Sequence, residues 1–159
     1  MKRIKDLYLF LLGICIGVEI AIGAFLAPIV FFPTKYIGEG VLTHFQSGQL
    51  MTQVFLKYNI LLLIVCAFCV IYEIINLIKN KDEVFNFKFS TFMLSLINVI
   101  LGASFVFYFT DYIVNAQNMG AEATQTAAFA SVHKVSEVVM KIMMLAQALL
   151  FFMRAYSKR

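Results

Sequence analysis

Among the titratable side chains inside long apolar stretches of the sequence, four could do chemistry together. Glu19 lies near the middle of the first stretch, and His133, Glu137 and Lys141 lie in the last. A charged group near the centre of a bilayer costs about 2.5–3.5 kcal/mol, so such a group needs a partner or a function. At 1.5 Å per residue, counted from the same side, Glu19 and Lys141 reach similar heights. The sequence therefore predicts a Glu19–Lys141 pair.

Helical spacing groups the other charges of the last stretch with Lys141. His133, Glu137 and Lys141 recur every four residues and share a face, and Glu137 competes with Glu19 for the Lys141 ammonium. The predicted inward face of this stretch consists of Ala130, His133, Glu137, Met140, Lys141, Met144 and Ala148. With Glu19, these residues predict a polar column that extends to the outer surface. It could be a proton or ion path, a substrate site, or a contact that holds helices together.

Two further apolar stretches carry polar stripes with the same period. One stripe consists of Phe55, Asn59, Leu62, Cys66, Glu73 and Asn76, and the other of Thr91, Ser95, Asn98, Gly102, Phe105 and Phe109. We expect these stripes to face the same interior, with Asn59 and Asn98 extending the polar column. Glu73 and Asp111 lie near the ends of their stretches, and we expect both to be solvated.

Metal or haem binding is an alternative function for the two histidines. His44 and His133 are both expected on the outer side, where their imidazoles could ligate haem iron or a transition metal. The competing interpretation is one solvent-exposed and one packing histidine, and it predicts no cofactor. Cys66 and Cys69 have the spacing of a metal pair, but a single pair inside an apolar helix is typical of small packing residues.

The composition determines the fold class that must position these residues. Of 159 residues, 62% are hydrophobic and only 14% are charged, whereas about 25% are charged in an average soluble domain. Four apolar runs approach or exceed the roughly 20 residues that cross a bilayer as a helix. They cover residues 7–31, 54–78, 89–114 and 129–153. The sequence predicts an all-α polytopic membrane protein, a four-transmembrane-helix bundle that forms one membrane domain over residues 1–159.

Basic residues predict the orientation of the bundle. They gather at both termini and in the second loop, as Lys2, Arg3, Lys5, Lys79, Lys81, Lys88, Arg154, Lys158 and Arg159. Lys35 is the only basic residue in the other two loops, which cover about 32–53 and 115–128. The positive-inside rule then places the termini in the cytoplasm and these two loops outside. We expect the plasma membrane, which is the inner membrane in bacteria. The net charge of +4 reports this topology and predicts no nucleic-acid partner.

A second face of the first stretch is built from small residues. Gly13, Gly17 and Ala21 continue into Ala24 and Pro28 on a side opposite Glu19. Small residues at this spacing favour close contact between membrane helices. Both faces of this helix then require protein neighbours, which predicts a homo-oligomer or a larger membrane complex in addition to the lipid bilayer.

Two segments resemble a known family. The first stretch ends Gly23-Ala24-Phe25-Leu26-Ala27-Pro28-Ile29-Val30-Phe31, and the last begins Phe129-Ala130-Ser131-Val132-His133-Lys134-Val135-Ser136. They are similar to the transmembrane protein 205-like family, domain of unknown function 4149, whose members are small four-span proteins. The residues that match its motifs are Gly23, Ala27, Pro28, Phe31, Phe129, His133 and Ser136. Val132 replaces the usual Leu, and the Asn that commonly follows the Ser is missing, so Glu137 and Lys141 rest on their spacing alone.

The resemblance implies little about activity, because the bacterial members of this family have none assigned. Its eukaryotic members are associated with drug and metal tolerance, and the architecture is similar to that of four-helix membrane proteins for copper uptake and haem biosynthesis. The sequence contains no Ser-His-Asp arrangement, phosphate loop or zinc-protease motif, so we expect no enzyme. The favoured function is handling of an ion or small solute. The alternatives are haem or metal binding through His133, and a structural or accessory subunit.

Overall fold

Four long helices make up the fold. The computed structural model describes residues 2–157, so Lys158 and Arg159 lie outside the described residues. The first helix runs through α1 (Lys2–Ile20), η1 (Ala21–Leu26) and α2 (Ala27–Phe31), and the second is α4 (His44–Lys79). The third runs through α5 (Phe85–Ser104), η2 (Phe105–Thr110) and α6 (Asp111–Asn118), and the fourth is α7 (Ala127–Tyr156). The connections contain α3 (Thr34–Ile37) and η3 (Ala123–Gln125).

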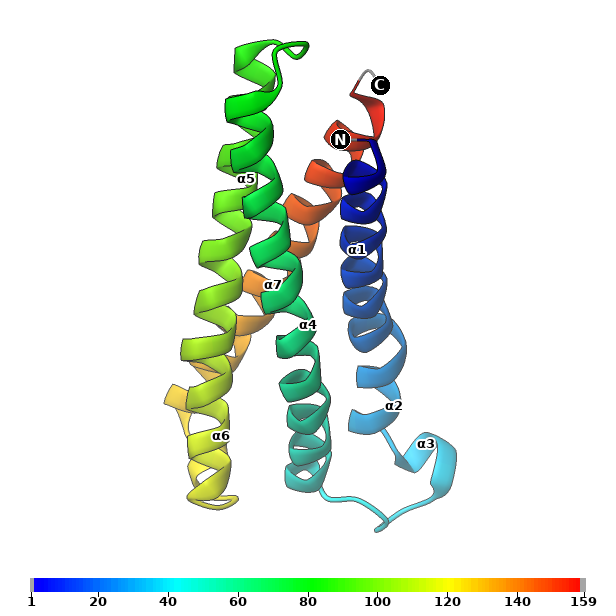
Figure 1. Ribbon diagram of the computed structural model, residues 1–159. Coiled ribbons are helices and arrows are strands. Elements are labelled where there is room, and N and C mark those ends of the chain that lie inside the picture. Colours follow the sequence, from blue (N-terminus) through cyan, green and yellow to red (C-terminus); the bar gives the residue numbers. More distant parts are fainter. Residues whose placement is uncertain (1, 158–159) are drawn as a thin grey trace.

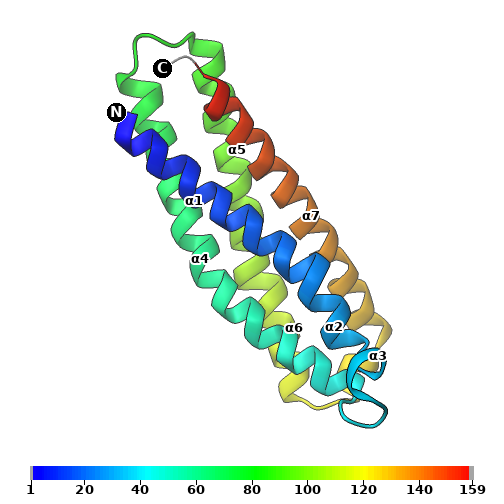
Figure 2. The same cartoon turned by 90° about the vertical axis from the view of Figure 1, so that its right-hand side faces the viewer.

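The four helices form a ring in which each packs against two neighbours. α4 contacts α1 and α5, and α7 closes the ring by contacting α5 and α1. Both termini lie at one end of the bundle with the α4–α5 connection, while α3 and the α6–α7 connection lie at the other end (Figures 1 and 2). The connections are short, so the helices alternate in direction and the chain returns to the end where it began.

The predicted helices are confirmed, and the structure makes each of them longer. All four are long and apolar enough to cross a membrane. Within the predicted first loop, residues 32–53, the mixed polar and apolar stretch from Val41 to Val54 predicts either an interfacial helix or an extension of the second span. The structure shows the extension, because α4 already begins at His44. Thr43 caps that end: its hydroxyl accepts a hydrogen bond from the Gln46 backbone N–H at 3.2 Å, and its own backbone N–H donates to the Gln46 side chain at 2.9 Å. This capping box satisfies backbone groups that a helix end leaves unpaired.

Side-chain burial is arranged as expected for helices in an apolar solvent. The interior holds apolar residues such as Tyr8, Leu12, Leu62 and Leu150, together with many polar ones. The outer surface carries large apolar side chains, among them Ile60, Ile64, Phe107, Leu145 and Leu149. An exposed apolar surface of this extent marks a contact with lipid or protein.

Two wide helical turns interrupt the first and third helices. η1 and η2 are π-helical segments of six residues each. In η2 the Thr110 hydroxyl donates to the carbonyl of Phe105, five residues earlier, at 3.0 Å. Both segments adjoin Tyr58 of α4: η1 begins two residues after Glu19, a hydrogen-bond partner of Tyr58, and the Phe105 ring lies 6.4 Å from the Tyr58 ring. Such turns frequently occur at functional sites.

Candidate functional site

Glu19 lies at the centre of the bundle and is bound by neutral side chains. It is only 2% exposed. The Tyr58 hydroxyl donates to its Oε1 atom, and Gln147 Nε2 donates to the same oxygen at 2.9 Å. The Tyr58 oxygen also lies 3.9 Å from Cys15 Sγ. The second carboxyl oxygen, Oε2, is buried and has no hydrogen-bond partner among the described residues.

Helix periodicity explains why these side chains meet. Buried residues of α1 follow intervals of three and four, which places Glu19 on the inward face with Tyr8, Leu12, Cys15 and Ile22. On α7 the same rule produces an inward face of Ser136, Met143, Gln147, Leu150 and Arg154. Glu19 and Gln147 are therefore the polar members of two inward faces that lie side by side.

Further polar groups line the interior on both sides of Glu19 along the bundle. Asn59 Nδ2 donates to the Thr110 hydroxyl at 3.0 Å, beside η2. Asn98 donates to the backbone carbonyl of Leu94 at 3.0 Å. The side-chain oxygens of Asn59, Asn98 and Gln147 are buried without a hydrogen-bond partner among the described residues. Buried polar atoms are usually satisfied, so these free acceptors are an unusual concentration of unused hydrogen-bonding capacity.

A second polar cluster closes the end of the bundle that holds the termini. Arg154 is fully buried and donates to Glu73 through Nε and Nη2, with the Nε–Oε1 distance 2.8 Å. Its Nη1 donates to Glu83 at 2.7 Å, and Nη2 also donates to the Thr91 hydroxyl at 2.7 Å. Tyr8 donates to Glu73 at 3.0 Å. Side chains from all four helices therefore belong to one hydrogen-bonded cluster around Arg154 and Glu73.

Glu83 lies in the α4–α5 connection and completes this cluster. Partial burial raises its pKa. Hydrogen bonds from Asn76 and Arg154, together with the positive charge of Arg154, lower the pKa by more than burial raises it. Its pKa therefore lies below the ordinary value of 4.5. Lys88 donates to the carbonyl of Leu77 at 3.3 Å and to that of Asn80. Both carbonyls lie at the C-terminal end of α4, where backbone carbonyls lack a partner within the helix and a cation is favoured.

The predicted Glu19–Lys141 pair is wrong. Lys141 and Glu137 are exposed, because the inward face of α7 is centred on Ser136 rather than on Glu137, one residue and 100° away. The interior positions instead hold neutral Gln147 opposite Glu19, and Arg154 opposite Glu73. His133 is partly exposed, stacks on Phe129 at 6.0 Å between ring centroids, and approaches Glu137 at 3.4 Å between Nδ1 and Oε1.

The remaining predicted site residues differ in how far they are buried. The structure buries Asn59, Asn98 and the rest of the two stripes on α4 and on the third helix, with Phe55 partly exposed. The expectation that Glu73 is solvated is wrong, since it is fully buried against Arg154. Of the small-residue face, Gly13 is partly exposed, and a Cβ added there would lie 3.7 Å from the Phe151 ring, whereas Gly17 and Ala21 are exposed. The remaining motif residues are Gly23 and Pro28, exposed; Ala27, Phe31 and Phe129, partly exposed; and Ser136, buried.

The histidines do not form a metal site in the part of the chain that the structure describes. His44 is exposed at the start of α4, and its ring lies 5.4 Å from the Phe31 ring between centroids, tilted by 42°. Residues 2–157 contain no group of three His, Cys, Asp or Glu side chains that could hold a metal ion. Cys15, Cys66 and Cys69 are buried free thiols.

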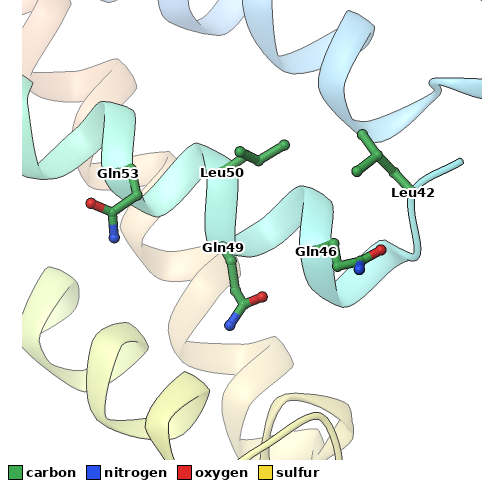
Figure 3. Close-up of a pocket in the computed structure, with 5 residues that line it drawn as sticks. All are labelled: Leu42, Gln46, Gln49, Leu50 and Gln53. Carbon is green, nitrogen blue, oxygen red and sulfur yellow. The ribbon is translucent and has the colours of Figure 1, made fainter.

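A shallow depression lies beside the first turns of α4. Its volume is about 300 Å³, and it is lined by Leu42, Gln46, Gln49, Leu50 and Gln53. Figure 3 shows the three glutamine side chains projecting from successive turns of α4, with Leu42 and Leu50 beside them. Three uncharged amides place hydrogen-bonding groups on this surface and add no charge to it.

The sequence was also compared with known proteins. Neither the curated proteins nor the solved structures gave a match. One family, described as domain of unknown function (DUF4149), matches residues 10–122, which include Glu19 and Tyr58 but end before α7. Because this match covers more than half of the chain, the protein belongs to the DUF4149 family.

Proposed function

We propose that this chain is a multi-pass protein of the plasma membrane, the inner membrane in a bacterium, with both termini in the cytoplasm. Four helices of sufficient length and apolar character support insertion. The basic residues support the orientation, because Lys5, Lys79, Lys88 and Arg154 all lie near the end where the chain begins and finishes.

Within that membrane, the proposed function is the binding and release of a proton at Glu19, a non-enzymatic role. The observation that carries the proposal is the Glu19 environment: a buried carboxyl with neutral donors on Oε1 and no partner on Oε2. A structural carboxylate at this depth would be expected to have a cation beside it, as Glu73 does. Glu19 has neither Lys nor Arg as a partner among the described residues, so its charge can change without breaking an ion pair.

The surroundings of Glu19 are compatible with proton movement. Tyr58, Gln147, Asn59 and Thr110 supply hydroxyl and amide groups around and beyond it. Tyr58 and Gln147 contact Oε1 directly, with nothing between them and the carboxyl, which favours a proton over a larger solute. The two π-helical turns next to Tyr58 give local freedom to rearrange hydrogen bonds.

Proton flux into proteoliposomes tests this proposal. The purified chain, reconstituted with a pH-sensitive dye inside the vesicles, should acidify the lumen under an imposed pH gradient faster than empty vesicles. Glu19→Gln keeps the shape and both hydrogen-bond donors but cannot ionise, so flux should fall to the level of empty vesicles. Asp111→Asn, a change at an exposed carboxyl of α6, is the matched control and should leave flux unchanged. Equal flux from wild type and Glu19→Gln would refute the proposal.

A structural or accessory role is the second candidate. The cluster of Glu73, Arg154 and Glu83 supports it, because this cluster joins helices without leaving its ionic oxygens free. If Glu19 serves only the same purpose, Glu19→Gln and Tyr58→Phe should lower the thermal stability of the bundle, and wild type should show no flux.

A further inference from the structure

An exposed charged patch on α7 lies where the outer surface is otherwise apolar. Glu137 and Lys141 are exposed, and their neighbours on the surface, Val138, Ile142 and Leu145, are 48%, 50% and 66% exposed. Lys141 stands thirteen residues before Arg154, ~20 Å along the helix. This distance places its backbone within the ~30 Å of hydrocarbon that the helices are proposed to cross.

These charges lack sufficient partners within one copy of the chain. Lys141 makes no ion pair or hydrogen bond among residues 2–157, and Glu137 approaches only the partly exposed His133. Ionised side chains that face lipid are rare, and they normally face a protein interior or a water-filled space. The patch therefore requires a protein surface that supplies both a cation and an anion at the same depth.

A second copy of this chain supplies that surface. In a two-fold symmetric contact, residue i of one copy meets residue j of the other, and j meets i. Glu137 and Lys141 are one helical turn apart, so two α7 helices side by side place each carboxylate near the ammonium of the other copy. Ala130, seven residues before Glu137, and Ala148, seven after Lys141, share this face. Their small side chains permit close approach.

We propose that the α7 face of Ala130, Glu137, Lys141 and Ala148 is the contact between two copies of this chain in the membrane, held by two Glu137–Lys141 ion pairs between the copies. α7 runs along one edge of the bundle (Figure 2), and Ala130, Glu137 and Lys141 are exposed. The small-residue face of α1 is also exposed at Gly17 and Ala21, but it carries no charge that would select a partner. The contact rests on membrane insertion and is independent of proton binding at Glu19.

Charge reversal in two separately tagged full-length chains tests the contact. Glu137→Lys leaves lysine at both 137 and 141, and Lys141→Glu leaves glutamate at both, so each variant repels itself at these two positions. We expect each variant alone to be monomeric in lipid nanodiscs, with association roughly a hundredfold weaker than wild type. Co-expressed, the two variants should copurify, because the contact between them has opposite charges. Lys57→Glu, a reversal on the exposed side of α4, is the matched control and should leave the dimer intact.

Cysteine cross-linking identifies the face independently. Ala130→Cys should form a disulfide-linked dimer in native membranes, and Gly17→Cys should not. A monomeric wild type, failure of the two charge variants to copurify, or cross-linking at Gly17→Cys alone would overturn the assignment. Glu19→Gln should dimerise like wild type, so loss of flux and loss of the dimer are separate outcomes.

Discussion

At the residue scale, the clearest contrast in the molecule is between two buried carboxyl groups. Glu73 is paired with a buried guanidinium, whereas Glu19 accepts hydrogen bonds from uncharged groups only. A buried ion pair adds little net stability, but removal of one partner leaves an uncompensated charge. The two carboxyls should therefore respond differently when a neighbour is changed.

Arg154→Met tests the ionic cluster. The substitution keeps an apolar stem of similar length but removes the cation that pairs with Glu73 and Glu83. Because Glu73 is then a buried charge without a partner, we expect the free energy of unfolding to fall by about 3–5 kcal/mol. Thermal unfolding in detergent, followed by circular dichroism, measures the change. Adding Glu73→Met should recover a large part of the loss, since the buried charge is then gone. A single variant as stable as wild type would show that the ion pair is dispensable.

The lowered pKa of Glu83 makes a pH prediction with a definite sign. Because its pKa in the folded protein is below the ordinary 4.5, its ionised form is stabilised by folding. This contribution is complete above about pH 4.5 and is lost as pH falls through the folded pKa. We expect stability to decrease with acidification below pH 4.5, and the decrease should be smaller in Glu83→Gln. Melting temperatures of both proteins across pH 3–7 check it, and identical slopes would contradict it.

At the scale of the elements, glycines show where the helices touch. A Cβ at Gly102 would lie 3.1 Å from Cys66 Sγ and 3.6 Å from Leu62 Cγ, across the α4–α5 contact. A Cβ at Gly17 would meet no atom within 4 Å. Both glycines sit in helix interiors, where alanine is intrinsically preferred, so the difference between them isolates packing from propensity.

Gly102→Ala and Gly17→Ala should therefore have opposite effects. Both neighbours of Gly102 are short side chains of the buried α4 face, which cannot move aside, so overpacking should cost about 1–3 kcal/mol. Gly17→Ala should stabilise by up to about 1 kcal/mol through helix propensity. Thermal unfolding of the two variants side by side provides the measurement. Similar shifts of the same sign would show that the α4–α5 contact tolerates an extra methyl group.

The elements also show how far sequence reasoning extends. Lengths and polarity were sufficient for the four helices, and the stripes on α4 and the third helix were placed correctly because their polar residues share a single phase. On α7 they do not. One face of α7 carries the charged residues Glu137 and Lys141. A second face, 100° away, carries the polar residues Ser136 and Gln147. Periodicity does not say which of the two faces is buried. The Glu73–Arg154 pair joins residues 81 positions apart, a relation that depends on how the helices are arranged.

At the scale of the whole molecule, both termini and the α4–α5 connection share one end. Cysteine labelling tests which side this end occupies. Lys81→Cys should react with a membrane-impermeant maleimide only after the cells are opened, whereas Glu122→Cys, in the α6–α7 connection, should react in intact cells. Both positions are exposed, so folding should not block either reaction. Labelling with the sides exchanged would invert the proposed topology while leaving the bundle unchanged.

α4 is longer than the thickness of the bilayer that it is proposed to cross. Its 36 residues extend ~54 Å, and a tilt of 40° would still leave ~41 Å along the bilayer normal. The hydrocarbon needs only ~30 Å. In the proposed orientation, with the Lys79 end at the cytoplasmic boundary, the first turns of α4 would project beyond the outer surface of the hydrocarbon layer. The depression lined by Gln46, Gln49 and Gln53 would then lie on the part of α4 that projects beyond the membrane. A water-soluble molecule could reach it without entering the membrane.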